Sequence, residues 1–291
     1  MKMKRTFVIV LFLVVVATYV YYQLTGLKES SPQLMPIKVA YGIPLVKVNI
    51  QGYLIDLVLD LGAHDSSLTR DIIKKTGLKN LKEMTRSVDI YGKISTHQLF
   101  SSSKTLIENN LFNNMVFIES KNFNSDFEPN TPQILTSGRI GRKPFLNKIL
   151  IIDRRRELCL IEQAHLGRKV DPRQYEQGDW IKVQAHLDKG IGVNLRLITD
   201  SGEVKNFILD TGSNVSLIDR KNSPQVPIDF FSKVEQISLK LDKNIPLGTF
   251  SFCPFNFADI GFDGILGFDF FDHYIVCIDF VNREIFLKSY E

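Results

Sequence analysis

The sequence predicts a mainly β protein that is built from two similar halves and preceded by an apolar N-terminal segment. The composition favours strands, because 21 Phe residues accompany many Val and Ile residues. Two separate segments of the first half recur in the second half in the same order. With 291 residues, of which 44% are hydrophobic and 23% charged, the chain can bury a substantial core and is not generally disordered.

The N-terminus predicts a membrane anchor. A charge-free apolar run over residues 6–22 approaches the roughly 20 residues that a helix needs to span a bilayer. A cleaved signal peptide is the alternative, but no A-x-A-like cleavage site follows the run. The run ends in tyrosines, which suit a membrane interface. We therefore expect an anchor or signal over 1–24 and a polar, Pro-containing linker over 25–40.

The first repeated segment ends in an aspartate in each half. Residues 42–60 (GIPLVKVNIQGYLIDLVLD) align without a gap with residues 192–210 (GVNLRLITDSGEVKNFILD) at an offset of 150. Both predict an apolar strand, a turn at Gly, and a second apolar strand. Asp60 and Asp210 follow these second strands.

A second pair of segments aligns near the end of each half. Residues 138–153 (GRIGRKPFLNKILIID) match residues 264–279 (GILGFDFFDHYIVCID) at an offset of 126. Matches at both ends of each half, in the same order, indicate a duplication. The halves are expected over 41–162 and 191–291, with 163–190 as the connection between them.

The residues around Asp210 resemble those of a known enzyme family. Residues 208–213 (Ile-Leu-Asp-Thr-Gly-Ser) are similar to the hydrophobic–hydrophobic–Asp-Thr-Gly-Ser motif of pepsin/retropepsin-type aspartic proteases. Residues 264–267 (Gly-Ile-Leu-Gly) resemble the hydrophobic–hydrophobic–Gly element found further along each half in that family. The resemblance covers nearly all of 41–288. It implies the bilobal acid-protease fold, with two closed, barrel-like β lobes related by a pseudo-twofold axis and a peptide cleft between them.

The resemblance also implies a catalytic pair, Asp60 and Asp210. Hydrolysis of an amide by water needs a base to activate the water and an acid to protonate the product side. Two adjacent carboxylates cannot both be ionised, so they share one proton and divide these roles. No cysteine stands in a CxxC pair and no His cluster has metal-ligand spacing, so we expect no metal and no organic cofactor.

Further residues of the two loops are expected to support the pair. Gly62 and Gly212 would permit the tight loops that bring the aspartates together. By resemblance, Thr211 would hydrogen-bond across to the opposing loop, and Ser213 could donate to Asp210. Ala63 stands at the position of Ser213 in the first loop, as it does in retroviral members of the family.

The first half departs from the family pattern at two positions. Leu61 follows Asp60 where a hydroxyl residue is expected, and Arg139 replaces an apolar residue before Ile140. The leading interpretation is an aspartic endopeptidase that acts on a peptide or protein substrate. These departures leave open a pseudoprotease that binds peptides without cutting them. A membrane-tethered structural module is a third possibility.

Two local elements are also predicted in the first half. Tyr91 and Gly92 lie where pepsin-like enzymes carry a β-hairpin flap, with an ordinary hairpin turn as the alternative. Residues 66–78 (SSLTRDIIKKTGL) predict a short helix that ends at Gly77.

Other residues have simpler interpretations. Three sparse cysteines are expected as buried free thiols rather than as a disulfide framework. A net charge of +4, with its densest basic run at 154–156 and no interleaved aromatic residue, argues against a nucleic-acid partner. Asp153 and Asp279 are interpreted as turn or strand-end residues, and His64 as incidental. With both aspartates in one chain, we expect a monomer.

The N-terminal segment gives the first testable prediction. We expect the full-length protein to stay in the membrane fraction after a carbonate wash, as a single-pass protein with its catalytic domain outside the cytoplasm. The reason is the charge-free run behind Lys2, Lys4 and Arg5, which are expected to remain on the cytoplasmic side. Release into the soluble fraction with an intact N-terminus would contradict this.

Overall fold

The computed structural model describes residues 32–120, 137–164, 170–188, 192–221, 234–241, 245–258 and 261–290. Residues Gln33–Glu291 form one compact unit. The anchor expected over 1–24, and the linker as far as residue 31, lie outside the described residues. Within the described ranges, no helix has the length and apolar character needed to cross a membrane.

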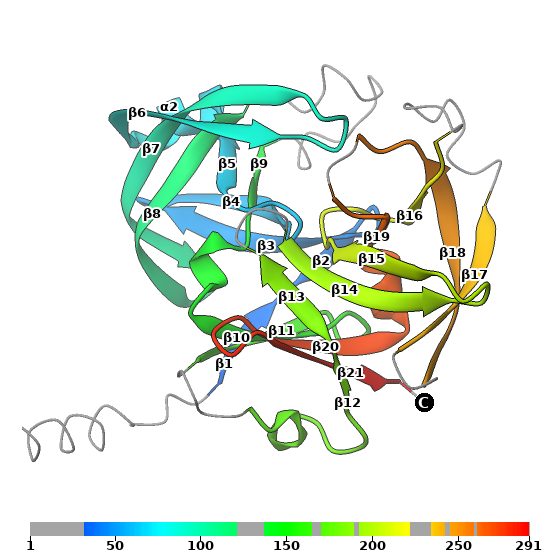
Figure 1. The fold of residues 1–291 in the computed structure, drawn as a ribbon. Helices are drawn as coiled ribbons and strands as arrows, with labels where there is room; N and C mark the ends of the chain where they lie inside the picture. Colours follow the sequence, from blue (N-terminus) through cyan, green and yellow to red (C-terminus); the bar gives the residue numbers. More distant parts are fainter. Residues whose placement is uncertain are drawn as a thin grey trace, which may run out of the picture. The chain divides into compact units, whose positions relative to one another are not determined.

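The first half forms an eight-stranded sheet that closes on itself (Figure 1). Its strands follow the order β2-β3-β4-β9-β5-β8-β7-β6, and β3 also pairs with β7. This extra pairing closes a ring of β3, β4, β9, β5, β8 and β7. The strands are β2 Lys38–Ala40, β3 Ile43–Ile50, β4 Tyr53–Leu59, β5 Ser66–Thr69, β6 Lys79–Val88, β7 Ile94–Ile107, β8 Asn110–Ser120 and β9 Gly138–Ile140.

The second half repeats this arrangement with seven strands. Their order is β13-β14-β15-β19-β16-β18-β17, and a pairing of β14 with β17 closes the ring. Each strand of this ring has an equivalent at the same place in the first ring, so both lobes are closed as predicted. The strands are β13 Ala185–Asp188, β14 Gly192–Thr199, β15 Val204–Leu209, β16 Ser216–Asp219, β17 Glu235–Lys240, β18 Pro246–Phe255 and β19 Gly264–Leu266.

The strand register confirms the duplication that the sequence predicts. The strand before each aspartate pairs in parallel with the short strand of the second repeated segment. Val58 is the partner of Arg139 in the first half, and Ile208 is the partner of Ile265 in the second. These pairs match the two sequence offsets, so Arg139 and Ile265 occupy equivalent positions.

A third sheet joins the two halves, and the sequence analysis did not foresee it. Its order is β1-β11-β10-β20-β21-β12, and β10 of the first half pairs directly with β20 of the second, with Ile151 opposite Cys277 (Figure 1). The expected linker contributes β1. The strands are β1 Gln33–Pro36, β10 Lys148–Asp153, β11 Leu158–Gln163, β12 Ile181–Val183, β20 Tyr274–Asp279 and β21 Glu284–Ser289.

The connection between the halves packs against this central sheet. Trp180 and Tyr175 lie on an apolar cluster that includes Ile151, Ile275 and Phe286 from the sheet strands. Burial of such side chains removes apolar surface from water, which stabilises the contact. The segment expected as a connection therefore covers one face of the sheet.

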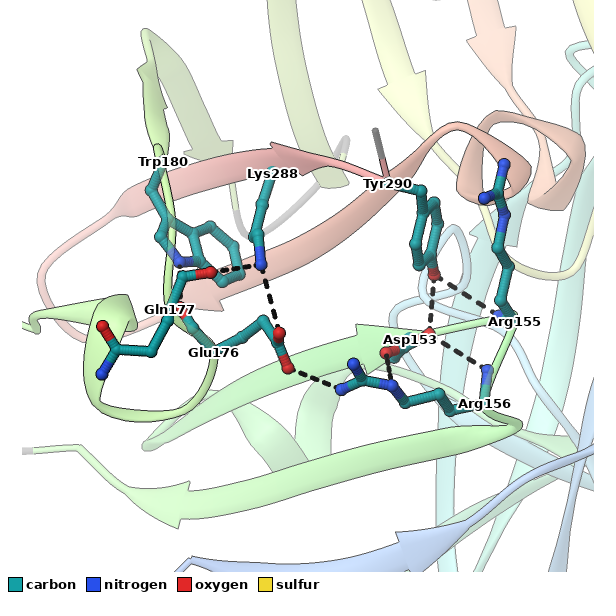
Figure 2. Close-up of polar contacts among 8 residues, drawn as sticks. All are labelled: Asp153, Arg155, Arg156, Glu176, Gln177, Trp180, Lys288 and Tyr290. Atoms are coloured by element: carbon teal, nitrogen blue, oxygen red, sulfur yellow. Dashed lines mark hydrogen bonds and ion pairs between the residues drawn. The ribbon is translucent and has the colours of Figure 1, made fainter.

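Polar contacts fix the same segment in place (Figure 2). Glu176 accepts from Arg156 Nη1 at 2.6 Å and from Lys288 Nζ at 3.2 Å, and its carbonyl oxygen accepts from Trp180 Nε1 at 2.9 Å. Beside it, Asp153 accepts from the Arg156 amide at 3.1 Å, which is the turn role predicted for this residue. The glutamate thus bridges basic side chains from both halves.

The helical elements are short. Helix α2 (Arg70–Thr76) is shorter than the helix predicted over 66–78, because residues 66–69 form strand β5. It ends where the sequence predicts, because Gly77 adopts the left-handed conformation with φ of 62° and its amide donates to Lys74 O. The 3₁₀ turns η3 (Lys143–Phe145) and η6 (Phe268–Asp272) follow β9 and β19 at equivalent places, and η4 (Pro172–Gln174) lies in the connection. As predicted, the three cysteines are buried and free.

Candidate active site

The two aspartates leave equivalent strands in equivalent ways. The Asp60 amide donates to Ile140 O at 2.9 Å, and the Asp210 amide donates to Leu266 O at 2.9 Å. Each bond ties the end of the aspartate strand to the short strand beside it. Both carboxylates are therefore presented from loops that start at the same point in each ring.

The two loops face each other at close range. A Cβ atom on Gly62 would lie 2.3 Å from Cγ of Asp210, and one on Gly212 would lie 2.6 Å from Cγ of Asp60. Any side chain at either position would collide with the opposite carboxylate, so glycine is required at both. The structure thus brings the two predicted aspartates together, each against the glycine of the opposite loop.

Thr211 links the loops as predicted. Its hydroxyl donates to Leu59 O at 2.6 Å and accepts from the Leu61 amide at 2.9 Å. Thr211 is fully buried, so both bonds lie away from water. Leu61 has no hydroxyl to make the reciprocal pair of bonds, and its side chain is completely buried in the core instead.

A buried arginine that the sequence analysis missed also holds the first loop. Arg142 is only 2% exposed, and its Nη1 donates to Gly62 O at 2.8 Å and approaches Leu61 O at 3.5 Å. The offset of 126 places Arg142 opposite Phe268 of the second half. This difference between the halves, an arginine in one and an apolar residue in the other, is the sequence signal that could have identified Arg142.

Arg139 makes the most direct contact with the aspartates. Its Nη1 lies 2.9 Å from Oδ2 of Asp60, in an ion pair in which the Asp60 side chain is 9% exposed and the Arg139 side chain 31%. The sequence analysis treated Arg139 as a degraded structural position. The structure corrects this interpretation, because the side chain that replaces an apolar one reaches the aspartate.

Each carboxylate accepts a hydrogen bond from an amide of its own loop. Oδ1 of Asp60 accepts from the Ala63 amide at 2.8 Å, and Oδ1 of Asp210 accepts from the Gly212 amide at 2.8 Å. The expected bond from Ser213 to Asp210 is wrong, because the Ser213 hydroxyl donates to Val215 O at 2.7 Å. Ser213 therefore supports its own loop rather than the carboxylate.

The pKa of Asp210 is raised to about 8. Burial is the largest cause, and the neighbouring charge of Asp60 is the next; the Gly212 amide and the charge of Arg139 act in the opposite direction. A carboxyl group in this environment keeps its proton well above the usual pH range for aspartate.

The predicted hairpin is present and reaches the other half. Strands β6 and β7 form it, and Ile90 O at its tip accepts from the Ala258 amide at 3.2 Å. The Tyr91 ring lies 5.6 Å from the Phe255 ring, and a Cβ atom on Gly92 would lie 2.8 Å from Cβ of Ala258. The tip of a first-half hairpin therefore contacts the second half.

Comparisons with known proteins identify the fold. No family model matches the chain, and no curated protein matches it in sequence. Among solved structures it is similar to an aspartic proteinase from Irpex lacteus, with a TM-score of 0.55 and 11% identity over 89% of this chain and 97% of that one. It is also similar to basic 7S globulin from soybean, with a TM-score of 0.55 and 10% identity over 89% of this chain and 95% of that one. At these identities the likeness shows the fold alone, and it includes a protein named as a globulin. The chain has the fold of the pepsin-type aspartic proteases.

Proposed function

We propose that this protein is an aspartic endopeptidase in which Asp60 and Asp210 activate one water molecule between them. One observation carries the proposal. Two aspartates at equivalent strand ends face each other, each packed against the glycine of the opposite loop. In this fold that arrangement supplies the base and the acid that amide hydrolysis needs.

The chemical step uses one ionised and one protonated carboxyl group. The ionised carboxylate takes a proton from water while the water oxygen bonds to the carbonyl carbon of the peptide. The protonated carboxyl group gives its proton to the carbonyl oxygen, which leaves a tetrahedral diol. The C–N bond then breaks as the nitrogen receives a proton and the diol returns a proton to the pair. The raised pKa of Asp210 supports this scheme, because it keeps one proton on the pair up to about pH 8.

The hairpin of β6 and β7 supports a peptide or protein as the substrate. We propose that it acts as a flap, with Tyr91 and Gly92 at its tip over the substrate. Both aspartates belong to one chain, so a monomer would suffice. An N-terminal anchor would place this site outside the cytoplasm, at a membrane.

A pseudoprotease is the second candidate, and two contacts favour it. Leu61 leaves the cross-loop hydrogen bonds one-sided, since only Thr211 provides a hydroxyl. Arg139 also occupies an oxygen of Asp60. A protein of this kind would bind peptides at the same site without turnover. Cleavage of a mixed peptide library across pH 3–8, with inhibition by a statine-type compound, would separate the two functions.

Asp60→Asn and Asp210→Asn should each lower kcat by about 10²–10⁴-fold while the fold is kept, because neither carboxyl group can perform both proton transfers alone. Peptide cleavage and circular dichroism are the measurements. Asp56→Asn, on strand β4 that leads to Asp60, is the matched control and should keep full activity. Near-normal turnover in Asp60→Asn would exclude the single-chain pair and favour a homodimer that uses two copies of Asp210.

The stability of the protein should depend on Asp210 between about pH 4 and pH 8. Over this range the folded protein keeps a proton that the unfolded chain, with a pKa of about 3.9, has lost. The unfolded state then binds fewer protons, so the free energy of unfolding falls as pH rises. Asp210→Asn lacks this effect. The melting temperature of the variant minus that of the wild type should therefore increase as pH rises to 8. Calorimetry at several pH values measures this difference in melting temperature. A constant difference for Asp210→Asn would contradict the raised pKa.

Leu61→Thr should raise kcat, or create activity in a silent protein, with little change in melting temperature. A hydroxyl at residue 61 could complete the cross-loop bonds and fix the carboxylates more accurately, which strongly affects rate. The lost apolar burial, worth about 1.5–3 kcal/mol, opposes the gain of about 1–3 kcal/mol from satisfying a buried amide. Thr211→Val is the converse variant and should lower both activity and stability. Equal or lower activity in a folded Leu61→Thr protein would show that Leu61 belongs to a differently built loop.

A further inference from the structure

The two halves differ at the residue that lies beside each aspartate. Arg139 and Ile265 occupy the same register position on β9 and β19, next to the strands that end in Asp60 and Asp210. Ile265 is buried in an apolar cluster with Ile208, Leu217, Cys253, Phe255 and Phe257. One aspartate therefore has a guanidinium beside it, and the other has an apolar surface.

The contact of Arg139 with Asp60 is a direct one. Nη1 donates to Oδ2 of Asp60 at 2.9 Å, while Oδ1 is already held by the Ala63 amide. Neither loop offers its aspartate a hydroxyl, because Ala63 has none and Ser213 donates to Val215 O. Among the described residues, Arg139 is the one basic side chain that bonds to either carboxylate.

We propose that Arg139 is a positioning residue that fixes Asp60 as the ionised member of the pair, so that Asp60 is the base and Asp210 the acid. This inference rests on the proposed function. In this role Arg139 determines which carboxyl group holds the shared proton and in which direction the ionised oxygen points.

The electrostatics of the site support this assignment. Asp210 from the second loop and Arg139 from β9 are charged groups that lie directly beside Asp60, while Arg142 donates to backbone carbonyl oxygens. A hydrogen bond between a guanidinium and a carboxylate stabilises the ionised form of the acid, and more strongly where water is scarce. Asp60 is 6% exposed. Arginine stays charged at every pH at which such a pair works.

The surroundings of Asp210 favour the opposite protonation state. Burial raises the pKa of Asp210, Gly212 provides one backbone donor as Ala63 does for Asp60, and among the described residues no guanidinium is hydrogen-bonded to it. With Arg139 beside Asp60, the lower-energy arrangement places the charge on Asp60 and the proton on Asp210. The arginine thereby breaks the equivalence that the duplicated loops would otherwise give the two carboxyl groups.

Arg139→Ile tests the proposal by installing the residue found at the equivalent position of the second half. The full-length protein and this variant are compared in the pH dependence of kcat/KM on a cleaved library peptide. We expect the acidic limb to move up by roughly 1–3 pH units in Arg139→Ile, because the neighbouring cation no longer favours ionisation of Asp60. Arg139→Lys should keep the acidic limb of the pH profile near its wild-type position while kcat falls. The lysine keeps the positive charge but loses the geometry of the guanidinium hydrogen bond to Asp60. Arg70→Ile, which removes an exposed arginine paired with Glu119 at 2.6 Å, should change neither.

A second measurement keeps this test separate from the proposed function. In protein labelled with ¹³C at aspartate Cγ, the Asp60 signal is assigned by its absence in Asp60→Asn and titrated by NMR. Arg139→Ile should raise the midpoint of Asp60 even if no peptide is ever cut, in which case only the proposed function fails. Arg139→Gln serves the same purpose if Arg139→Ile does not fold. An unmoved Asp60 midpoint would overturn the role of Arg139. A higher kcat with an unmoved limb would also overturn it, and would identify Arg139 as a blocking group.

Discussion

The contact between the two aspartate loops is the constraint on which the rest of this structure depends. Thr211 bonds to the backbone on both sides of Asp60, and each glycine leaves room for the opposite carboxylate. These contacts bring the two closed rings of strands together at the aspartate loops. These hydrogen bonds are buried, so breaking them would leave polar groups unsatisfied. The two loops are therefore held in fixed positions relative to each other.

The central sheet extends this constraint through the molecule. Strands from the end of each half leave their own ring and pair with each other through β10 and β20. The connecting segment then covers one face of the sheet, where Glu176 bridges Arg156 and Lys288. The two rings are therefore joined at the loops and again at the sheet, so a shift of one ring would disturb both contacts.

The duplication is symmetrical in its backbone and asymmetrical in its chemistry. The rings share strand order and register, yet the first loop carries Leu61 and two nearby arginines where the second half has Thr211 and apolar residues. Arg142 holds the carbonyl oxygens of a loop whose cross-loop bonds are one-sided. Arg139 provides the side-chain donor that Ala63 cannot. The departures of the first half thus occur together with contacts that stabilise its loop.

The family resemblance implied the closed β lobes. The sequence by itself determined the duplication, the two aspartates at equivalent strand ends, the glycines beside them and the helix ending at Gly77. These features are local or repeated, so period, turn chemistry and self-alignment reveal them. Only the tertiary structure decided the central sheet, the partner of the Ser213 hydroxyl and the roles of Arg139 and Arg142. Pairing between distant strands leaves no local pattern. The direction of a long, flexible arginine side chain depends on which acceptors the fold brings within its reach.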